Sequence, residues 1–117
     1  MSDTLPEVST RELDVMRDTV GEDSFSMLID NFIEDIEDHI TLFQDILESR
    51  DMNMLEIKSH ALKSAAYSFG ATSLGNKCKA VEMATKAGML DHVDVLTKNM
   101  ITEAQKTAAY YNEEFKD

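Results

Sequence analysis

The chain has 117 residues, of which 43% are hydrophobic, and its formal net charge is −12 at pH 7. This length predicts a single domain over residues 1–117, with a core large enough to fold without disulfides or metal. The negative charge argues against nucleic acid and anionic membrane surfaces as partners. No apolar run approaches a membrane span and no secretory signal is visible, so we expect a cytoplasmic protein.

Proline occurs only at position 6 and cysteine only at position 78, a composition that favours uninterrupted helices. Period-2 alternation of β-branched residues is not sustained anywhere, so no strand is expected. Cys78 has no second cysteine to pair with, and we interpret it as a reduced thiol in the core.

Helical periodicity places two helices in the first half of the chain, after residues 1–8, which we expect to be frayed. A short helix follows Ser9 or Thr10 and ends before Gly21, and a long helix follows Asp23 or Ser24. The long helix has apolar residues every three or four positions: Leu28, Phe32, Ile36, Ile40, Phe43 and Leu47. Acidic side chains occupy most of its other positions, which predicts a solvated face.

Three more helices are predicted after a turn at residues 49–53. The first runs from about Met54 to Phe69, the second begins near Thr72, and the third begins near Asp91. Four long helices joined by short turns predict an all-α fold, an antiparallel up-and-down four-helix bundle with a short additional N-terminal helix.

The formal charge changes sign in the middle of the chain. Residues 1–57 hold 16 acidic side chains and three arginines, whereas residues 58–117 hold seven acidic side chains and eight lysines. The change falls at the segment HALKSAAYSFGA, residues 60–71.

This segment places a histidine and a lysine one helical turn apart. In a helical projection, one face carries His60 and Lys63 together with Glu56, Ile57, Ser64, Tyr67 and Ala71. The opposite face is apolar and is the candidate core face, so His60 is predicted to be exposed. Neutral imidazole is a nucleophile near neutral pH, and a lysine close by can stabilise a phosphoryl group on it. An unmodified, solvent-exposed His–Lys pair is the alternative, because H-x-x-K by itself is common.

A longer pattern in this region resembles the histidine-containing phosphotransfer (HPt) domain of bacterial phosphorelays. The matching residues are His60, Leu62, Lys63, Gly70, Ala71, Leu74, Cys78 and Glu82. Ser64 stands where that family usually has glycine. The HALKS opening followed by SFGA is similar to a branch of stand-alone quorum-sensing relay proteins, so this departure indicates a branch of the family.

The resemblance implies roles for the residues of the exposed face. His60 would accept a phosphoryl group from the aspartate of a receiver domain in a hybrid sensor kinase, and would pass it to the aspartate of a response regulator. Lys63 would neutralise the phosphoryl oxygens. The surface on which the receiver docks would consist of Glu56, Ile57, Ser64, Tyr67 and Ala71. No cofactor is expected, because any Mg²⁺ would belong to the receiver, and we expect a monomer. The sequence leaves open whether Lys77, Lys79 or Lys86 also helps docking.

Two other functions stay open: an acidic helical adaptor in which His60 is never modified, and the phosphoacceptor module of a chemotaxis-type kinase. The chain shows no linker or kinase segment, which disfavours the second. No ATP-binding motif is visible, so we expect a phosphocarrier and not an autonomous kinase. His39 and His92 are interpreted as ordinary helical residues, because no Glu-x-x-His pair of a di-metal bundle is present.

Overall fold

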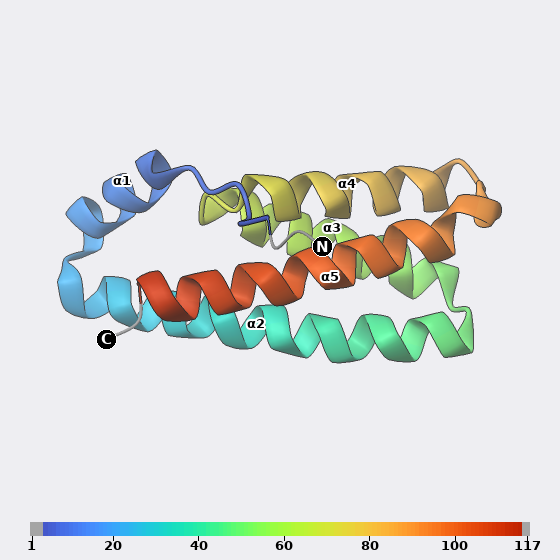
Figure 1. Ribbon diagram of the computed structural model, residues 1–117, viewed down its shortest axis with the longest axis horizontal. Coiled ribbons are helices and arrows are strands. Elements are labelled where there is room, and N and C mark those ends of the chain that lie inside the picture. Colours follow the sequence, from blue (N-terminus) through green and yellow to red (C-terminus); the bar gives the residue numbers. More distant parts are fainter. Residues whose placement is uncertain (1–3, 116–117) are drawn as a thin grey trace.

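The computed structural model describes residues 4–115, and within that range the regular structure consists of five α-helices without a strand. The helices are α1 (Thr10–Val20), α2 (Glu22–Ser49), α3 (Met52–Ser68), α4 (Thr72–Lys86) and α5 (Leu90–Glu114). Figure 1 shows α2 to α5 lying side by side along the long axis, with α1 beside the start of α2 at one end. The predicted all-α bundle with a short N-terminal helix is therefore confirmed.

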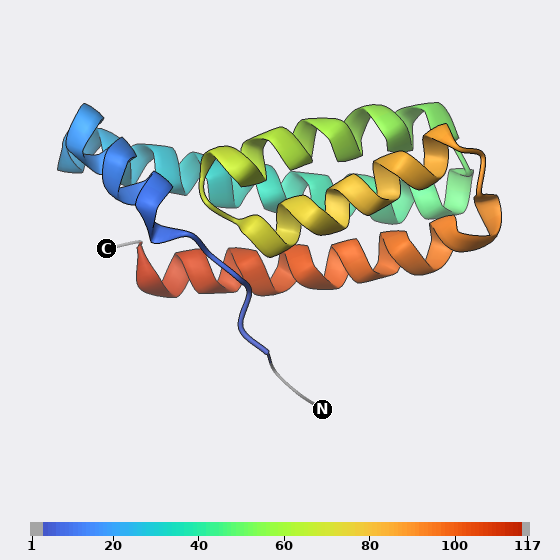
Figure 2. The same ribbon diagram turned by 90° about the horizontal axis from the view of Figure 1, so that it is seen from above.

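The helices of the bundle form a closed ring of neighbours. Packing contacts join α2 to α3, α3 to α4, α4 to α5 and α5 back to α2. Figure 2 shows α3 and α4 running next to each other, and this pair packs most extensively. Because short turns join consecutive helices, neighbours run in opposite directions. The close pairing of α3 and α4 is what assembles side chains from the two helices into one site.

Two helix starts differ from the sequence prediction by a few residues. The second helix begins at Glu22, directly after Gly21, whose φ of 86° makes the junction with α1. The third begins at Met52, because the Asp51 side chain accepts a hydrogen bond from the Met54 backbone N–H at 3.1 Å and caps that end.

The turn between α3 and α4 is held by the segment that precedes α1. Gly70 has a φ of 75°, and its carbonyl accepts a hydrogen bond of 2.7 Å from the Ser9 backbone N–H. The Glu7 backbone N–H donates to the Ser73 hydroxyl at 2.8 Å. A Cβ at position 70 would lie 2.2 Å from the Ser9 carbonyl oxygen, so this approach requires glycine. Glu7, which lies within the segment expected to fray, is therefore hydrogen-bonded to the bundle, while residues 1–3 lie outside the described range.

The core is centred on a slightly different stripe of α2 than the sequence indicated. Phe32, Ile36 and Phe43 are buried as predicted, but Leu28, Ile40 and Leu47 are only partly buried. Their place is taken by Phe25, Ile29, Ile33 and Ile46. The aromatic rings of Phe32, Phe69 and Tyr111 pack together, and the Tyr111 hydroxyl donates to the Phe69 carbonyl at 2.6 Å. These contacts join α2, the end of α3 and α5.

No helix among the described residues is both long and apolar enough to cross a membrane.

Candidate functional site

His60 lies on the outer face of α3, as the helical projection predicted. Leu55, Leu62 and Ala66 of the same helix are buried, whereas the His60 side chain is 58% exposed. Ser59, immediately before His60, is also buried, and its hydroxyl donates to the Glu56 carbonyl at 3.1 Å. The apolar spacing of α3 therefore fixes its rotation in the bundle and turns His60 toward solvent.

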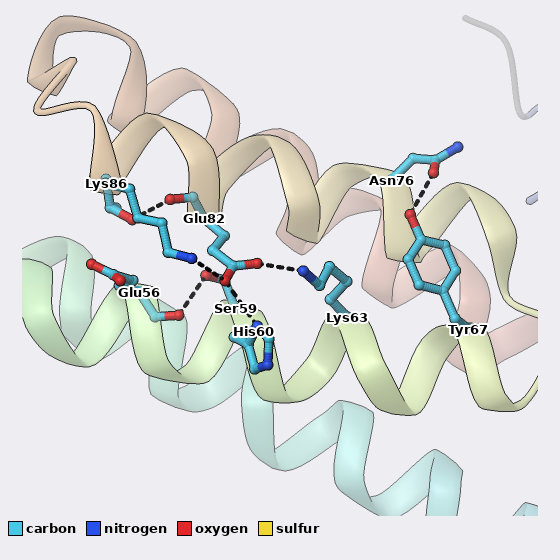
Figure 3. Close-up of polar contacts among 9 residues, drawn as sticks. Glu56, Ser59, His60, Lys63, Tyr67, Asn76, Glu82 and Lys86 are labelled. Atoms are coloured by element: carbon cyan, nitrogen blue, oxygen red, sulfur yellow. Dashed lines mark hydrogen bonds and ion pairs between the residues drawn. The ribbon is translucent and has the colours of Figure 1, made fainter.

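A buried carboxylate from the neighbouring helix lies beneath His60. Glu82 of α4 is only 5% exposed, and its Oε2 lies 2.8 Å from the His60 Nδ1. The Lys63 ammonium donates to the other oxygen, Oε1, at 2.7 Å, and the Lys86 ammonium lies 3.1 Å from Oε2. Figure 3 shows these three side chains converging on Glu82 from α3 and α4.

The charge state of Glu82 determines which nitrogen of His60 carries the proton. The hydrogen bond from Lys63 is the largest influence on the Glu82 pKa, which is lowered to about 2 against the opposing effect of burial. Bonds from Lys86 and His60 lower it further. An ionised carboxylate only accepts hydrogen bonds, so the His60 Nδ1 must be the donor. In the neutral ring, the lone pair is then on Nε2, the second ring nitrogen.

The other residues of the predicted face divide into two groups. Ile57, Ser64 and Tyr67 are exposed, and Glu56 is half-buried at the edge of the same face. Ala71 is buried, so the prediction that it lines a docking surface is wrong. The helix ends at Ser68, and the turn through Gly70 carries Ala71 into the core, where it precedes α4.

Beside His60 lies a shallow hollow of about 270 Å³. It is lined by Glu56, Ile57, His60, Glu82 and Lys86. The hollow lies on the Lys86 side of Glu82. Lys86, which can donate hydrogen bonds, and the apolar Ile57 therefore flank the imidazole there. Among the described residues, no group of three or more His, Cys, Asp or Glu side chains is arranged to hold a metal ion.

The sequence reasoning did not assign a role to Glu82 or Lys86. Glu82 matches the family pattern without a predicted role, and Lys86 is one of three lysines for which the sequence leaves a docking role open. A signal was available, because Glu82 is the only acidic residue between Lys58 and Lys86, and it lies four residues before Lys86 on one helix face.

The positions of His39, His92 and Cys78 agree with what the sequence predicted for them. The His39 Nδ1 lies 2.8 Å from the Asp35 carbonyl within α2, and its ring packs on Phe43. His92 is exposed at the start of α5. Cys78 is buried, and burial raises the pKa of its thiol to about 12, which makes it unreactive.

Comparison with known families decides the family of the chain. The family model described as "Hpt domain" matches residues 27–107, which include α3, α4 and most of α2 and α5. The chain belongs to the Hpt domain family. The predicted membership in the HPt family is therefore confirmed.

Individual Hpt relatives are similar along most of their length. The phosphorelay protein LuxU of Vibrio harveyi is 28% identical over 94 residues, which cover 80% of this chain and 82% of LuxU. LuxU of Vibrio vulnificus strain YJ016 is 31% identical over 87 residues, which cover 74% of each chain. The crystal structure of histidine-containing phosphotransfer protein B (HptB) from Pseudomonas aeruginosa PAO1 superposes with a TM-score of 0.86 at 24% identity. It covers 95% of this chain and 96% of HptB, which shows that the two Hpt folds are alike.

Proposed function

We propose that this Hpt protein is a phosphorelay intermediate in two-component signalling, which carries a phosphoryl group on Nε2 of His60. The observation that supports it is the hydrogen bond of 2.8 Å between the His60 Nδ1 and ionised Glu82. This bond holds the proton on Nδ1, leaves the lone pair on Nε2, and keeps the exposed ring in one orientation. Family membership and the likeness to phosphorelay proteins named LuxU support the same reading.

The transfer reaction can be written with the groups that the site provides. The Nε2 lone pair of neutral His60 attacks the phosphorus of an aspartyl phosphate on a receiver domain. The phosphorus–oxygen bond to the aspartate breaks, and that oxygen leaves with the electron pair as carboxylate. No proton moves, so the imidazole becomes a cation that still has its Nδ1 hydrogen. Glu82 faces this hydrogen and stabilises the positive charge that develops on the ring.

Lys63 has the second role at the site. Its side chain lies one helical turn from His60 and is 22% exposed, and its ammonium donates a hydrogen bond to Glu82 Oε1. Through this bond it keeps Glu82 ionised, and its positive charge favours the phosphoryl group that approaches His60. Its role predicted from sequence, neutralisation of the phosphoryl oxygens, is proposed to act through the charge of the ammonium while that group stays bound to Glu82.

The receiver domain is proposed to dock on the exposed face of α3 around His60. Ile57 and Tyr67 supply apolar surface on either side of His60, Ser64 is small enough to leave the ring accessible, and Glu56 lies at the edge. Any Mg²⁺ would be held by the receiver. We propose a cytoplasmic, monomeric carrier without a cofactor and without kinase activity, which takes the group from a hybrid sensor kinase and passes it to a response regulator. The HALKS and SFGA segments are the basis for placing it in a quorum-sensing pathway.

The proposal is tested by incubating the protein with a ³²P-labelled, phosphorylated receiver domain. We expect acid-labile, base-stable label on the wild-type protein and none on His60→Gln. His92→Gln is the matched control, because it removes an exposed histidine outside the site and should be labelled like the wild type. Equal labelling of His60→Gln and wild type would exclude His60 as the phosphoryl carrier and favour the adaptor alternative.

A further inference from the structure

Two lysines from different helices bind the same buried carboxylate, and their side chains differ in how freely they can move. Lys63 and Lys86 contact opposite oxygens of Glu82, at 2.7 and 3.1 Å. Lys63 is 22% exposed, whereas Lys86 is 57% exposed at the last turn of α4. A lysine on a partly covered stem is restrained by its surroundings, whereas an exposed four-carbon stem can move between partners with little cost.

Lys86 also lies close to the imidazole. Its ammonium and the His60 Nδ1 contact the same oxygen, Glu82 Oε2, at 3.1 and 2.8 Å, so the two nitrogen atoms can be no more than about 6 Å apart. Both residues line the hollow next to His60. Figure 3 shows Lys86 and Lys63 reaching Glu82 from opposite sides, with His60 next to the carboxylate.

The charges around His60 change when a phosphoryl group arrives. With His60 neutral, Glu82, Lys63 and Lys86 together carry one positive charge, and Glu56 at the edge of the hollow offsets it. A phosphoryl group adds about two negative charges at Nε2, while the ring itself becomes a cation, so the site gains about one net negative charge. Glu82 keeps its hydrogen bonds from Lys63 and His60 if Lys86 leaves it. Lys86 is therefore the cation that can move from Glu82 to the phosphoryl oxygens at the lowest cost.

We propose that Lys86 is a phosphoryl-binding residue, which turns from Glu82 to the phosphoryl oxygens when Nε2 of His60 is phosphorylated, while Lys63 stays on Glu82. This rests on the proposed function of His60. Lys63 then acts as the fixed cation that keeps Glu82 ionised, and Lys86 as the mobile cation that stabilises the phosphorylated state. The position of the phosphotransfer equilibrium between this protein and a receiver depends on Lys86.

The test compares wild type, Lys86→Ala, Lys86→Arg and the control Lys98→Ala, which removes an exposed lysine of α5, outside the site. Each protein is phosphorylated with potassium phosphoramidate, a small donor for imidazole nitrogen, and mixed with a purified receiver domain. Loss of one favourable, partly exposed charge contact should shift the equilibrium toward the receiver about three- to tenfold in Lys86→Ala. Lys86→Arg should restore most of the wild-type equilibrium, and Lys98→Ala should match the wild type.

A ³¹P NMR titration of the same phosphorylated proteins reports on contact with the phosphoryl group itself. A lysine next to the phosphoryl group favours its dianion, so Lys86→Ala should raise the pKa of the phosphoryl group by about half a unit to one unit. If Lys86 acted only through Glu82, the substitution would change the ring signals of unphosphorylated His60 and leave the phosphoryl pKa unaltered. That result would overturn the proposal.

The outcomes also separate this inference from the proposed function. If wild-type protein gains no label on His60 from either phosphoramidate or a phosphorylated receiver, the phosphorelay function itself is wrong. If the wild type is labelled and Lys86→Ala equals it in equilibrium and in ³¹P titration, only the role of Lys86 is wrong. An equal shift in Lys98→Ala would likewise refute a local role, because it would show an effect of net charge.

Discussion

At the scale of single residues, Glu82 links the stability of the fold to the chemistry of the site. It is a nearly buried acid that is held ionised by Lys63, Lys86 and His60, and it directs the His60 proton to Nδ1. The contacts from Lys63 and His60 also join α3 to α4. Removal of the negative charge should therefore affect both folding and the orientation of the imidazole.

The depressed pKa of Glu82 predicts how stability changes with pH. A carboxyl group whose pKa falls from 4.5 to about 2 on folding contributes stability at pH values above its unfolded pKa. This contribution is lost as pH falls from about 4.5 toward 2. We expect about 2 kcal/mol after allowance for the partly exposed lysines.

Urea unfolding at pH 6 and pH 2.5 measures this contribution in the wild type and in Glu82→Gln. The variant should be less stable at pH 6 and should lose less stability on acidification. Glu34→Gln, which changes an exposed acid of α2, should keep the pH dependence of the wild type. An identical pH dependence in Glu82→Gln would mean that the carboxylate is not held ionised by its neighbours.

At the scale of the helices, Tyr67 and Gly75 control how closely α3 and α4 approach near the end of the site. The Tyr67 ring lies against Gly75, where a Cβ would be 2.3 Å from the ring atom Cε1. The Tyr67 hydroxyl donates to the Asn76 side chain at 2.6 Å, as Figure 3 shows. Tyr67 was assigned from sequence to receiver docking alone, but its ring is also packed between the two helices. Its substitution should therefore cost stability as well as docking.

A double-mutant cycle tests this packing. Gly75→Ala should destabilise the wild type, because the added methyl group must displace the Tyr67 ring, even though alanine favours helix by about 1 kcal/mol over glycine. In a Tyr67→Ala background the same change should be neutral or stabilising. Thermal unfolding of the four proteins gives the coupling energy, which we expect to be about 1 to 2 kcal/mol. Additive effects would show that the ring and position 75 do not interact.

At the scale of the whole molecule, the acidic first half of the chain sets the long-range electrostatics. The chain carries a net charge of −12. Residues 1–57 have a formal charge of −13, whereas residues 58–117 have a formal charge of +1. Of the 16 acidic residues in the first half, nine lie on α2, and seven of the nine are exposed. Repulsion among these carboxylates opposes folding at low ionic strength.

Salt should therefore stabilise the protein. Raising NaCl from 10 to 200 mM shortens the screening length from about 30 Å to below 10 Å, and we expect the Tm to rise by roughly 3 to 5 °C. A double variant, Glu34→Gln with Asp38→Asn, should show a smaller rise because it begins with less repulsion. A fall in Tm with salt would instead indicate that ion pairs such as Arg50–Asp94, at 2.6 Å, dominate the stability.

The helices, their order in an antiparallel bundle and the exposure of His60 could all be predicted from the sequence. These follow from local rules, since apolar spacing of three or four residues and the glycines between runs depend on neighbours along the chain. The Hpt resemblance likewise rested on residues within one short stretch. Which side chains the helices bring together could be seen only in the folded protein. Glu82 lies 22 residues from His60, and only the packing of α3 on α4 shows that it holds the imidazole proton and binds both lysines. The turn at Gly70, held by Ser9, carries Ala71 from the predicted docking face into the core, because that contact joins segments far apart in sequence.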